Sequence, residues 1–370
     1  MEHNYALLLL YFPILISTVV LGFIIPFLNK ETIIFGIRIP YKEINNPMVE
    51  QLKRNFRHNY LATLIPYSIV LALSLYEYEN KSILSLGIIL SVFFIGYLYV
   101  LYNHKMAIIN NSIVKKDVGK KEQIIVVDTS FREGKYLIPF AWFIPSLIII
   151  IFCFLFITLN YDKIPATIPI KFNFDGKAIL FTSKTCFYVF LMPVSSIINL
   201  LLFVGIYFVI KRAKQQTSSN YPEKSKLQDR KFRYLWSGYI VILAFILSAF
   251  FVIISLKIDQ LINLSGELFT IINIVVPNAV LIGAIVLAIK TGQSGSRLKF
   301  DTGETANNYK IADDNFYWKL GMFYYNPDDP AFMVPKRMGI GWTFNFGHPI
   351  SFIILIALIA VPFIIKIFSK

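Results

Sequence analysis

Long apolar stretches without a charged residue constrain this chain more than any other feature of its sequence. Eight of them lack Asp, Glu, Lys, Arg and His, and they cover residues 5–28, 60–76, 83–102, 136–161, 185–210, 234–256, 268–289 and 350–365. A helix of about 20 such residues crosses the hydrocarbon core of a bilayer. We therefore predict an all-α integral membrane protein, a bundle of about eight transmembrane helices. The first stretch has no basic region before it and no cleavage site after it, so we predict a retained span.

The basic residues indicate an orientation. If the N-terminus lies outside, the loops at 29–59, 103–135, 211–233 and 290–349 face the cytoplasm and hold 28 of the 36 Lys and Arg residues. This asymmetry is what the positive-inside rule requires, so both termini are expected to be extracytoplasmic. The net charge of +14 then reflects topology, and nucleic-acid binding is disfavoured. The abundance of Ile, Asn and Lys is typical of an AT-rich genome, which favours a bacterial cell membrane.

The spans and loops divide the chain into four expected regions. Residues 1–135 form an N-terminal three-span region with a basic amphipathic inner loop, and 136–210 form a two-span unit with a patterned extracytoplasmic loop at 161–184. Residues 211–289 add a basic loop and two further spans, and 290–370 add an aromatic-rich cytoplasmic domain and the last span. The loops at 103–135 and 211–233 are rich in charge and poor in apolar residues, so we expect solvated connectors.

The first inner loop contains an amphipathic pattern. Asn46 can cap a helix that has Pro47 at its first position. The apolar residues then share one stripe, whereas Lys53, Arg54 and Arg57 lie on the other side. The stripe consists of Met48, Val49, Leu52, Phe56 and Tyr60. We predict a basic helix that lies on the cytoplasmic leaflet before the chain turns into the second span.

Three asparagines lie near the centres of apolar stretches. Asn199 follows Pro193 in one stretch, and Asn273 and Asn278 flank Pro277 in another. An amide in hydrocarbon is costly unless it is paired, so we expect these side chains to face each other or a wet cavity. A structural hydrogen bond between helices is the favoured interpretation. The alternative is a broken-helix transport site.

The extracytoplasmic loop at 161–184 has turn residues between alternating apolar ones, which predicts a short hairpin over the bundle. It contains a P-x-x-I-P-x-[HK]-F-N-x-x-G pattern, with Pro169, Lys171, Phe172, Asn173 and Gly176 as its central residues. This pattern resembles a bacterial domain of unknown function found beside SdpI-like immunity and signalling proteins. Lys171 stands where many relatives have histidine. The resemblance implies an extracytoplasmic ligand site made by these five residues.

The aromatic-rich loop before the last span has three further motifs: N-P-D-D-P at 326–330, V-P-K-R at 334–337 and G-W-T-x-N-F-G-x-P at 341–349. They resemble the C-terminal domain of unknown function that accompanies the outer pattern. Its motif residues here are Asn326, Asp328, Asp329, Lys336, Arg337, Trp342 and Asn345. Gly36, Arg38 and Pro40 are also similar to a G-x-R-x-P segment of SdpI-like proteins.

Physical chemistry adds alternatives for this domain. Trp318, Tyr324, Tyr325 and Trp342 suit the headgroup level as an aromatic belt. Asp313, Asp314, Asp328 and Asp329 can form an oxygen-rich metal site, although helix capping and turns explain both Asp pairs more simply. Lys336 and Arg337 can hold a lipid phosphate or pair with Asp328 and Asp329.

The sequence has no H-E-x-x-H, G-x-S-x-G or P-loop motif, and its four histidines lie outside the centres of the stretches. We therefore predict no enzyme, no cofactor and no metal. The expected function, implied by the resemblance, is immunity or signalling: the outer hairpin binds a peptide, and a regulator or an ABC exporter is a further partner beside the lipid bilayer. The alternative from another class is a transporter or the accessory subunit of an exporter.

Overall fold

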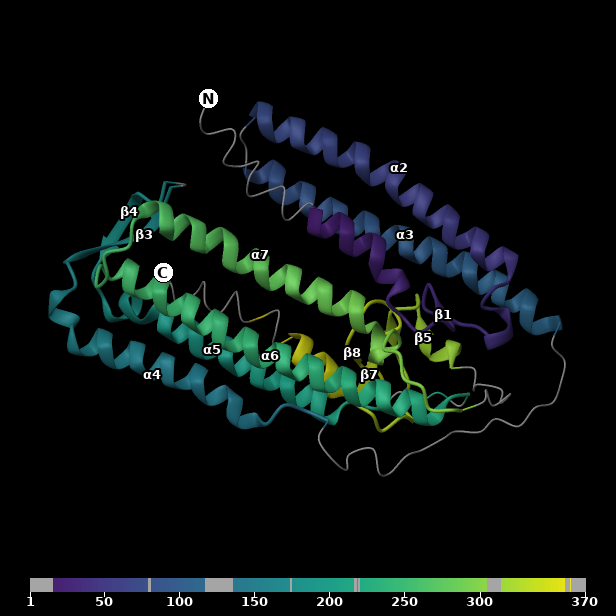
Figure 1. The fold of residues 1–370 in the computed structure, drawn as a ribbon. Helices are drawn as coiled ribbons and strands as arrows, with labels where there is room; N and C mark the ends of the chain where they lie inside the picture. The colour runs from purple at the N-terminus through teal and green to yellow at the C-terminus, as the bar shows by residue number, and fades with distance from the viewer. Residues whose placement is uncertain are drawn as a thin grey trace. The chain divides into compact units, whose positions relative to one another are not determined.

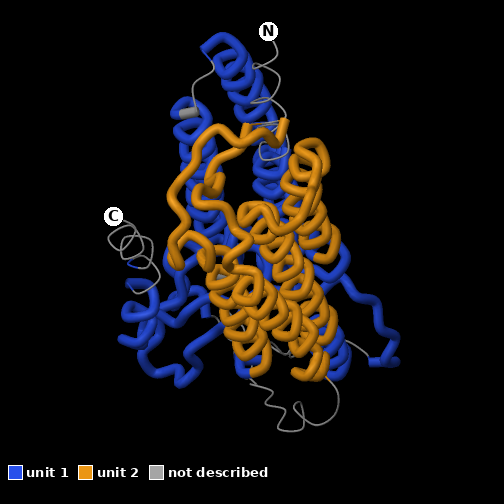
Figure 2. Tube along the Cα trace, turned by 90° about the vertical axis from the view of Figure 1, so that its left-hand side faces the viewer, with its two compact units in different colours: residues 1–133, 212–232, 288–370 blue, residues 134–211, 233–287 orange. Residues whose placement is uncertain are grey.

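A computed structural model describes residues 16–78, 81–116, 136–173, 175–215, 218, 220–304, 314–356 and 360. The chain divides into two compact units, which Figure 2 shows in two colours. The first unit comprises residues 1–133, 212–232 and 288–370, and the second comprises residues 134–211 and 233–287.

Within the described residues, six helices are long and apolar enough to cross a membrane. They are built on α2 (Pro47–Tyr78), α3 (Lys81–Lys116), α4 (Ile144–Leu159, after the 3₁₀ turn η4 at Phe140–Phe143), α5 (Cys186–Arg212), α6 (Pro222–Ile258) and α7 (Gly266–Thr291) (Figure 1). The prediction of a helical multi-pass membrane protein is confirmed. The count of eight stays a prediction, because the first and last stretches lie partly outside the described residues. An apolar helix at Ile16–Phe27 and a helical segment at 349–356 are what the structure describes of them.

Helix α2 begins as the sequence predicts but does not turn. The Asn46 side chain accepts a hydrogen bond from the Met48 amide at 3.0 Å, and Pro47 is the first helical residue. The helix then continues unbroken for 32 residues, or about 48 Å, which exceeds the hydrocarbon thickness of about 30 Å. The basic first turns therefore extend the span along its own axis, and the predicted turn from the leaflet into the span is wrong. Met48 is also exposed rather than part of the buried stripe.

The buried stripe of α2 packs on α3 in the first unit (Figure 1). Its members are Val49, Leu52, Phe56, Tyr60, Leu64, Leu71 and Leu75. They follow each other mainly at intervals of three and four residues, which places them on one face of the helix. The first five of them form an apolar core with residues of α3 and of the segment at 34–39, whereas Leu71 and Leu75 form a second, smaller cluster.

Two predicted loops are shorter than expected because helices extend into them. Helix α3 continues to Lys116, and α6 begins at Pro222. The α6 terminus is capped from far along the chain: the two carboxylate oxygens of Glu304 accept hydrogen bonds from the amides of Glu223 and Lys224, both at 2.9 Å. A carboxylate at a helix N-terminus satisfies free N–H groups and complements the helix dipole.

In the described part of the chain, the strands form four antiparallel pairs. The first unit contains β1 (Ile33–Ile34) with β2 (Ile37–Arg38), β5 (Trp318–Lys319) with β6 (Phe323–Tyr324), and β7 (Met333–Pro335) with β8 (Trp342–Phe344). The second unit contains β3 (Thr167–Phe172) with β4 (Ala178–Ser183). A hairpin is therefore present in the loop where the sequence predicts one. The strands β5 to β8 belong to a small domain, residues 314–349, which we call the C-terminal domain.

Candidate functional site

Two hairpins of the first unit have turns of the same kind. In the β1–β2 turn, Phe35 and Gly36 have φ angles of 46° and 78°; in the β5–β6 turn, Leu320 and Gly321 have 53° and 68°. Positive φ is strained for a bulky residue and free of strain for glycine. The Phe35 ring is fully buried among the rings of Phe27, Phe56 and two tyrosines of α3, and this packing offsets the strain.

The tips of these two hairpins touch through their glycines. A Cβ atom on Gly36 would lie only 2.6 Å from the Gly321 Cα atom. Two side chains of α3 secure the contact: the Asn103 amide donates to the Phe35 carbonyl at 2.7 Å, and the Tyr99 hydroxyl donates to the Gly321 carbonyl at 3.4 Å. No side chain larger than hydrogen fits at either tip, so the contact requires glycine at both.

Beside the tips lies what we call the arginine cluster: Arg38, Asp314, Asn315 and Arg337. Arg337 is 1% exposed. Its guanidinium donates to the Gly36 carbonyl at 2.9 Å and to Asn315 Oδ1 at 2.6 Å, and it forms an ion pair with Asp314. Arg38 Nε pairs with the same carboxylate at 2.8 Å. The G-x-R-x-P segment and the V-P-K-R motif, almost 300 positions apart, therefore share one carboxylate.

The cluster is held from several sides. Asn315 bonds both backbone groups of Arg38, accepting from its amide at 2.8 Å and donating to its carbonyl at 3.0 Å. The Arg337 guanidinium lies 5.0 Å from the centre of the Trp318 ring, a cation–π contact. Burial raises the pKa of Asp314, but the charges of Arg38 and Arg337 and their hydrogen bonds outweigh it, so the pKa is lowered. The carboxylate is thus ionised wherever the domain is folded near neutral pH.

The N-P-D-D-P and G-W-T-x-N-F-G motifs meet at Asn345, which is fully buried. Its Oδ1 accepts from the amides of Asn326 and Gly347 at 3.1 and 3.0 Å, and its Nδ2 donates to the Asn326 and Asp329 carbonyls at 2.8 and 3.2 Å. The Asn345 side chain therefore satisfies backbone amides and carbonyls of both motifs, as a neighbouring strand would in a sheet. The structure brings these motif residues together as a scaffold.

The acidic and basic residues of the motifs pair differently from the predictions. Asp329 forms an ion pair with Lys214 at 2.7 Å and accepts from the Tyr324 hydroxyl at 2.9 Å. Lys336 and Arg337 do not bind Asp328 or Asp329, because Arg337 is committed to Asp314. Asp314 and Asp329 are occupied in separate pairs, Asp328 is exposed, and Asp313 lies outside the described residues. Among the described residues no group of acidic, His or Cys side chains is suited to a metal.

The aromatic belt is also only partly present. Trp318 and Tyr324 are each 7% exposed and form the apolar core of the C-terminal domain with Val334. Trp342 packs on Phe232 of α6, with ring centres 5.7 Å apart. Tyr325 is exposed. The prediction of headgroup-level rings is therefore wrong for Trp318 and Tyr324, because a folded domain offers them a buried site.

In the second unit, the β3–β4 hairpin docks on the beginning of α7. Gly176 has a φ of 70°, as its turn position predicts, and a Cβ atom there would lie 2.2 Å from the Gly266 carbonyl oxygen. The Asn173 side chain accepts from the Lys177 amide at 2.7 Å and closes the turn. Phe172 packs on Phe269 with ring centres 4.7 Å apart.

The other residues of the predicted ligand site differ in exposure. Pro169 is buried, whereas Lys171 is exposed. On the hairpin, Ile170, Ile179, Leu180 and Phe181 also expose large apolar side chains. The free surface of the hairpin is therefore apolar with basic side chains at its margin.

A buried carboxyl in the same unit was missed by the sequence reasoning. Asp259 follows the last residue of α6 and is fully buried. Its Oδ2 lies 3.4 Å from the Ser255 hydroxyl, and its Oδ1 has no hydrogen-bond partner among the described residues. Burial raises its pKa to about 7, against the opposing effect of the Ser255 hydrogen bond. It lies immediately outside an apolar stretch, so a search for charges within stretches does not find it.

The intramembrane asparagines do not pair. Asn273 and Asn278 each donate to the carbonyl four residues earlier in α7, at 2.8 and 2.7 Å. Asn199 Oδ1 has no partner among the described residues. The predicted hydrogen bond between helices is therefore absent among these three asparagines, because bonding within α7 satisfies Asn273 and Asn278 without a partner helix.

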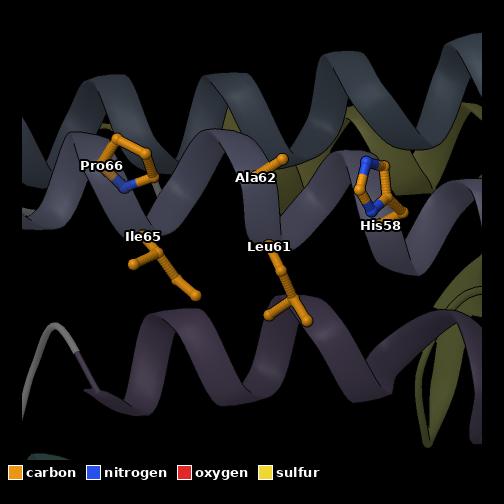
Figure 3. Close-up of a pocket in the computed structure, with 5 residues that line it drawn as sticks. All are labelled: His58, Leu61, Ala62, Ile65 and Pro66. Atoms are coloured by element: carbon orange, nitrogen blue, oxygen red, sulfur yellow. The ribbon is translucent and has the colours of Figure 1, made fainter.

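The surface of α2 carries an open pocket of about 330 Å³, lined by His58, Leu61, Ala62, Ile65 and Pro66. Figure 3 shows its side chains along one helix. The sequence singled out the basic turn before it but not the pocket.

Two segments of the chain match models of protein families. Residues 148–197 match a domain of unknown function, DUF1648, and residues 327–351 match a family of unknown function, DUF5808. The first contains the β3–β4 hairpin, and the second contains the Asn345 scaffold. No curated protein and no solved structure matches this chain. The chain is thus a multi-pass membrane protein with two segments that are similar to families of unknown function.

Proposed function

We propose that this protein is a receptor-like membrane protein of the immunity or signalling class, in which the β3–β4 hairpin binds an extracytoplasmic peptide and α7 transmits the bound state to the C-terminal domain. The observation that carries this proposal is the pair of attachments at the two ends of α7. At its first residue, Gly266 lies against the hairpin turn at Gly176. Two residues beyond its end, the Gln293 side chain both donates to and accepts from Gly341, each at 2.7 Å.

Chain connectivity alone makes α7 a mechanical link. It has 26 residues, or about 39 Å of helix. A helix attached at both ends can transmit a displacement of one attachment to the other, which is a two-site arrangement suited to signalling. The two family-model matches fall on the segments that these ends contact.

The resemblance of both segments to domains found beside SdpI-like proteins supports a peptide as ligand. The free apolar side chains Ile179, Leu180 and Phe181 lie consecutively on β4, whose outer edge is unpaired within the described residues. An extended peptide can add to such an edge through backbone hydrogen bonds. Lys171 and Lys177 at the margin favour a peptide with acidic residues.

The test uses the full chain in cells. Gly266→Ala places a Cβ atom 2.2 Å from the Asp175 carbonyl oxygen, whereas Gly205→Ala in α5 places one in open space. We expect gene deletion to sensitise cells to a membrane-active peptide, Gly205→Ala to restore protection, and Gly266→Ala to restore membrane abundance without protection. In purified protein, peptide should change the hydrogen exchange of residues 336–345.

Counterflow of a labelled small solute, with unchanged exchange at 336–345, would instead support the transporter or exporter-subunit alternative. Orientation is tested separately with single cysteines in a background without Cys153 and Cys186. Position 177 should react with an impermeant reagent from outside intact bacterial cells, and position 224 should not. Reaction of position 224 from outside would reverse the proposed topology with extracytoplasmic termini.

A further inference from the structure

The exposed face of α2 combines basic and apolar side chains in one continuous stripe. Arg54, Arg57 and His58 come first, and Leu61, Ala62, Ile65 and Pro66 follow at intervals of three and four residues. All seven are exposed. Residues so spaced lie one above the other on a helix. The stripe therefore changes from basic to apolar within about two turns, and it contains no acidic residue.

The apolar part of this stripe is hollow. It contains the open pocket of about 330 Å³, which begins at His58 and ends at Pro66. Figure 3 shows Leu61 and Ile65 projecting toward a neighbouring helix, the one at Ile16–Phe27, while Ala62 presents only a methyl group. The small side chain of Ala62 between larger neighbours makes the hollow.

Pro66 adds a polar feature. Proline has no N–H, so it cannot donate to the carbonyl of Ala62 four residues earlier. A backbone acceptor without its helical donor therefore lies at the pocket, one turn from the basic residues. A hydroxyl-bearing headgroup or glycerol backbone can donate to such an acceptor.

The dimensions suit one lipid. Arg54 and Ala62 are eight residues apart, or about 12 Å along the axis, so a phosphate held by the guanidinium groups places the start of an acyl chain at the pocket. Arg57 also lies 4.8 Å from the centre of the Phe27 ring, which orients its guanidinium. Three basic groups and no acidic group in the stripe select a negative headgroup over a zwitterionic one.

We propose that this stripe is a binding site for one anionic phospholipid, with its phosphate at Arg54 and Arg57 and an acyl chain in the pocket between His58 and Pro66. The site belongs to the leaflet at the basic end of α2, whichever side of the membrane that is. It is independent of the proposed peptide function.

The test measures lipid retention by the full-length protein. Delipidated protein in detergent is given phosphatidylglycerol or phosphatidylcholine, and native mass spectrometry counts the lipids bound per chain. We expect one phosphatidylglycerol to be retained in preference to phosphatidylcholine. The double variant Arg54→Gln, Arg57→Gln should weaken phosphatidylglycerol binding about thirtyfold, at about 1 kcal/mol for each basic residue.

Ala62→Phe fills the pocket and should prevent retention of either lipid, whereas Thr63→Phe, one residue away and also exposed, should leave retention unchanged. The double variant Lys42→Gln, Lys299→Gln removes two exposed charges elsewhere and is the control for charge. Equal retention of both lipids by the wild type, equal losses in the charge control, or full retention by Ala62→Phe would each overturn the proposal. Displacement of the lipid by millimolar glycerol 3-phosphate would show a phosphate site without an acyl-chain site, and would overturn it as well.

Discussion

Both units hold a hairpin through a backbone contact at glycine, but the chemistry around the two contacts differs. In the first unit, the contact of Gly36 with Gly321 lies beside buried charges that are all paired, with Asp314 between two arginines. In the second unit, the contact of Gly176 with Gly266 lies beside an aromatic pair, and the buried Asp259 has no cationic partner among the residues that the structure describes. A paired charge network specifies one arrangement, whereas an unpaired carboxyl makes its surroundings sensitive to pH.

The largest expected effect is in the arginine cluster. Arg337→Met leaves Asp314 with Arg38 as its only arginine partner. It also removes the guanidinium that donates to the Gly36 carbonyl. Breaking a buried ion pair on one side costs about 3–5 kcal/mol. Lys299→Met, at an exposed position, should change the free energy of unfolding by less than about 0.5 kcal/mol. Thermal unfolding in detergent measures both, and equal effects would show that the cluster does not stabilise the first unit.

The next effect is a difference between the two units in how their stability depends on pH. The pKa of Asp259 is raised from 3.8 to about 7, so between these values the folded state binds more protons than the unfolded state. Stability therefore falls as pH rises through this range, by up to about 1.4 kcal/mol per pH unit. The pKa of Asp314 is lowered, so its contribution is present above the unfolded pKa and is lost only as pH falls toward the folded value.

Between pH 5 and 8 the Asp259 effect should thus predominate. Melting temperatures of the wild type and Asp259→Asn, measured across this range, should converge at low pH and separate at high pH, with the variant more stable. A wild-type curve parallel to that of Asp259→Asn would rule out this carboxyl as the source. Asp162→Asn, at an exposed acidic position of the same unit, is the control.

A third comparison separates close contact from backbone strain in the first unit. Gly36 and Gly339 both have positive φ, 78° and 76°, but a Cβ atom would lie 2.6 Å from its nearest neighbour at Gly36 and 3.6 Å at Gly339. Alanine at either position incurs a similar strain. Overpacking should make Gly36→Ala worse than Gly339→Ala by about 1–3 kcal/mol. If the two variants have the same free energy of unfolding, the close contact at the tip adds no destabilisation beyond the backbone strain that both variants share.

The sequence predicted what depends on local pattern. The charge-free stretches predicted the membrane helices, and the turn residues from Asn173 to Gly176 predicted a hairpin with Gly176 at positive φ. The Asn46 cap and most of the buried stripe of α2 were likewise accessible, because capping and helical periodicity act within a few residues.

The arginine cluster could not be predicted, because its partners are far apart in the chain. Arg38 and Arg337 each belong to a recognisable motif, yet only the fold shows that both bind Asp314. The Glu304 cap of α6 was missed for the same reason. Neither hairpin turn carries the Asn-Gly or Asp-Gly pair that marks such turns in a sequence, since Phe35 and Leu320 stand before the glycines.

The smallest expected effect concerns the aromatic pair that docks the β3–β4 hairpin. Phe172 and Phe269 have ring centres 4.7 Å apart and an interplanar angle of 51°. A tilted pair contributes about 0.5–1.5 kcal/mol beyond the area it buries. A double-mutant cycle with Phe172→Ala and Phe269→Ala should therefore give a coupling energy in this range. Phe181, on the same hairpin but 53% exposed, is the matched control, and a cycle of Phe181→Ala with Phe269→Ala should give no coupling. Equal coupling in the two cycles would mean that the hairpin responds as a whole and that its docking does not depend on this pair. A selective coupling would instead place the docking free energy at the beginning of α7, where the proposed signal starts.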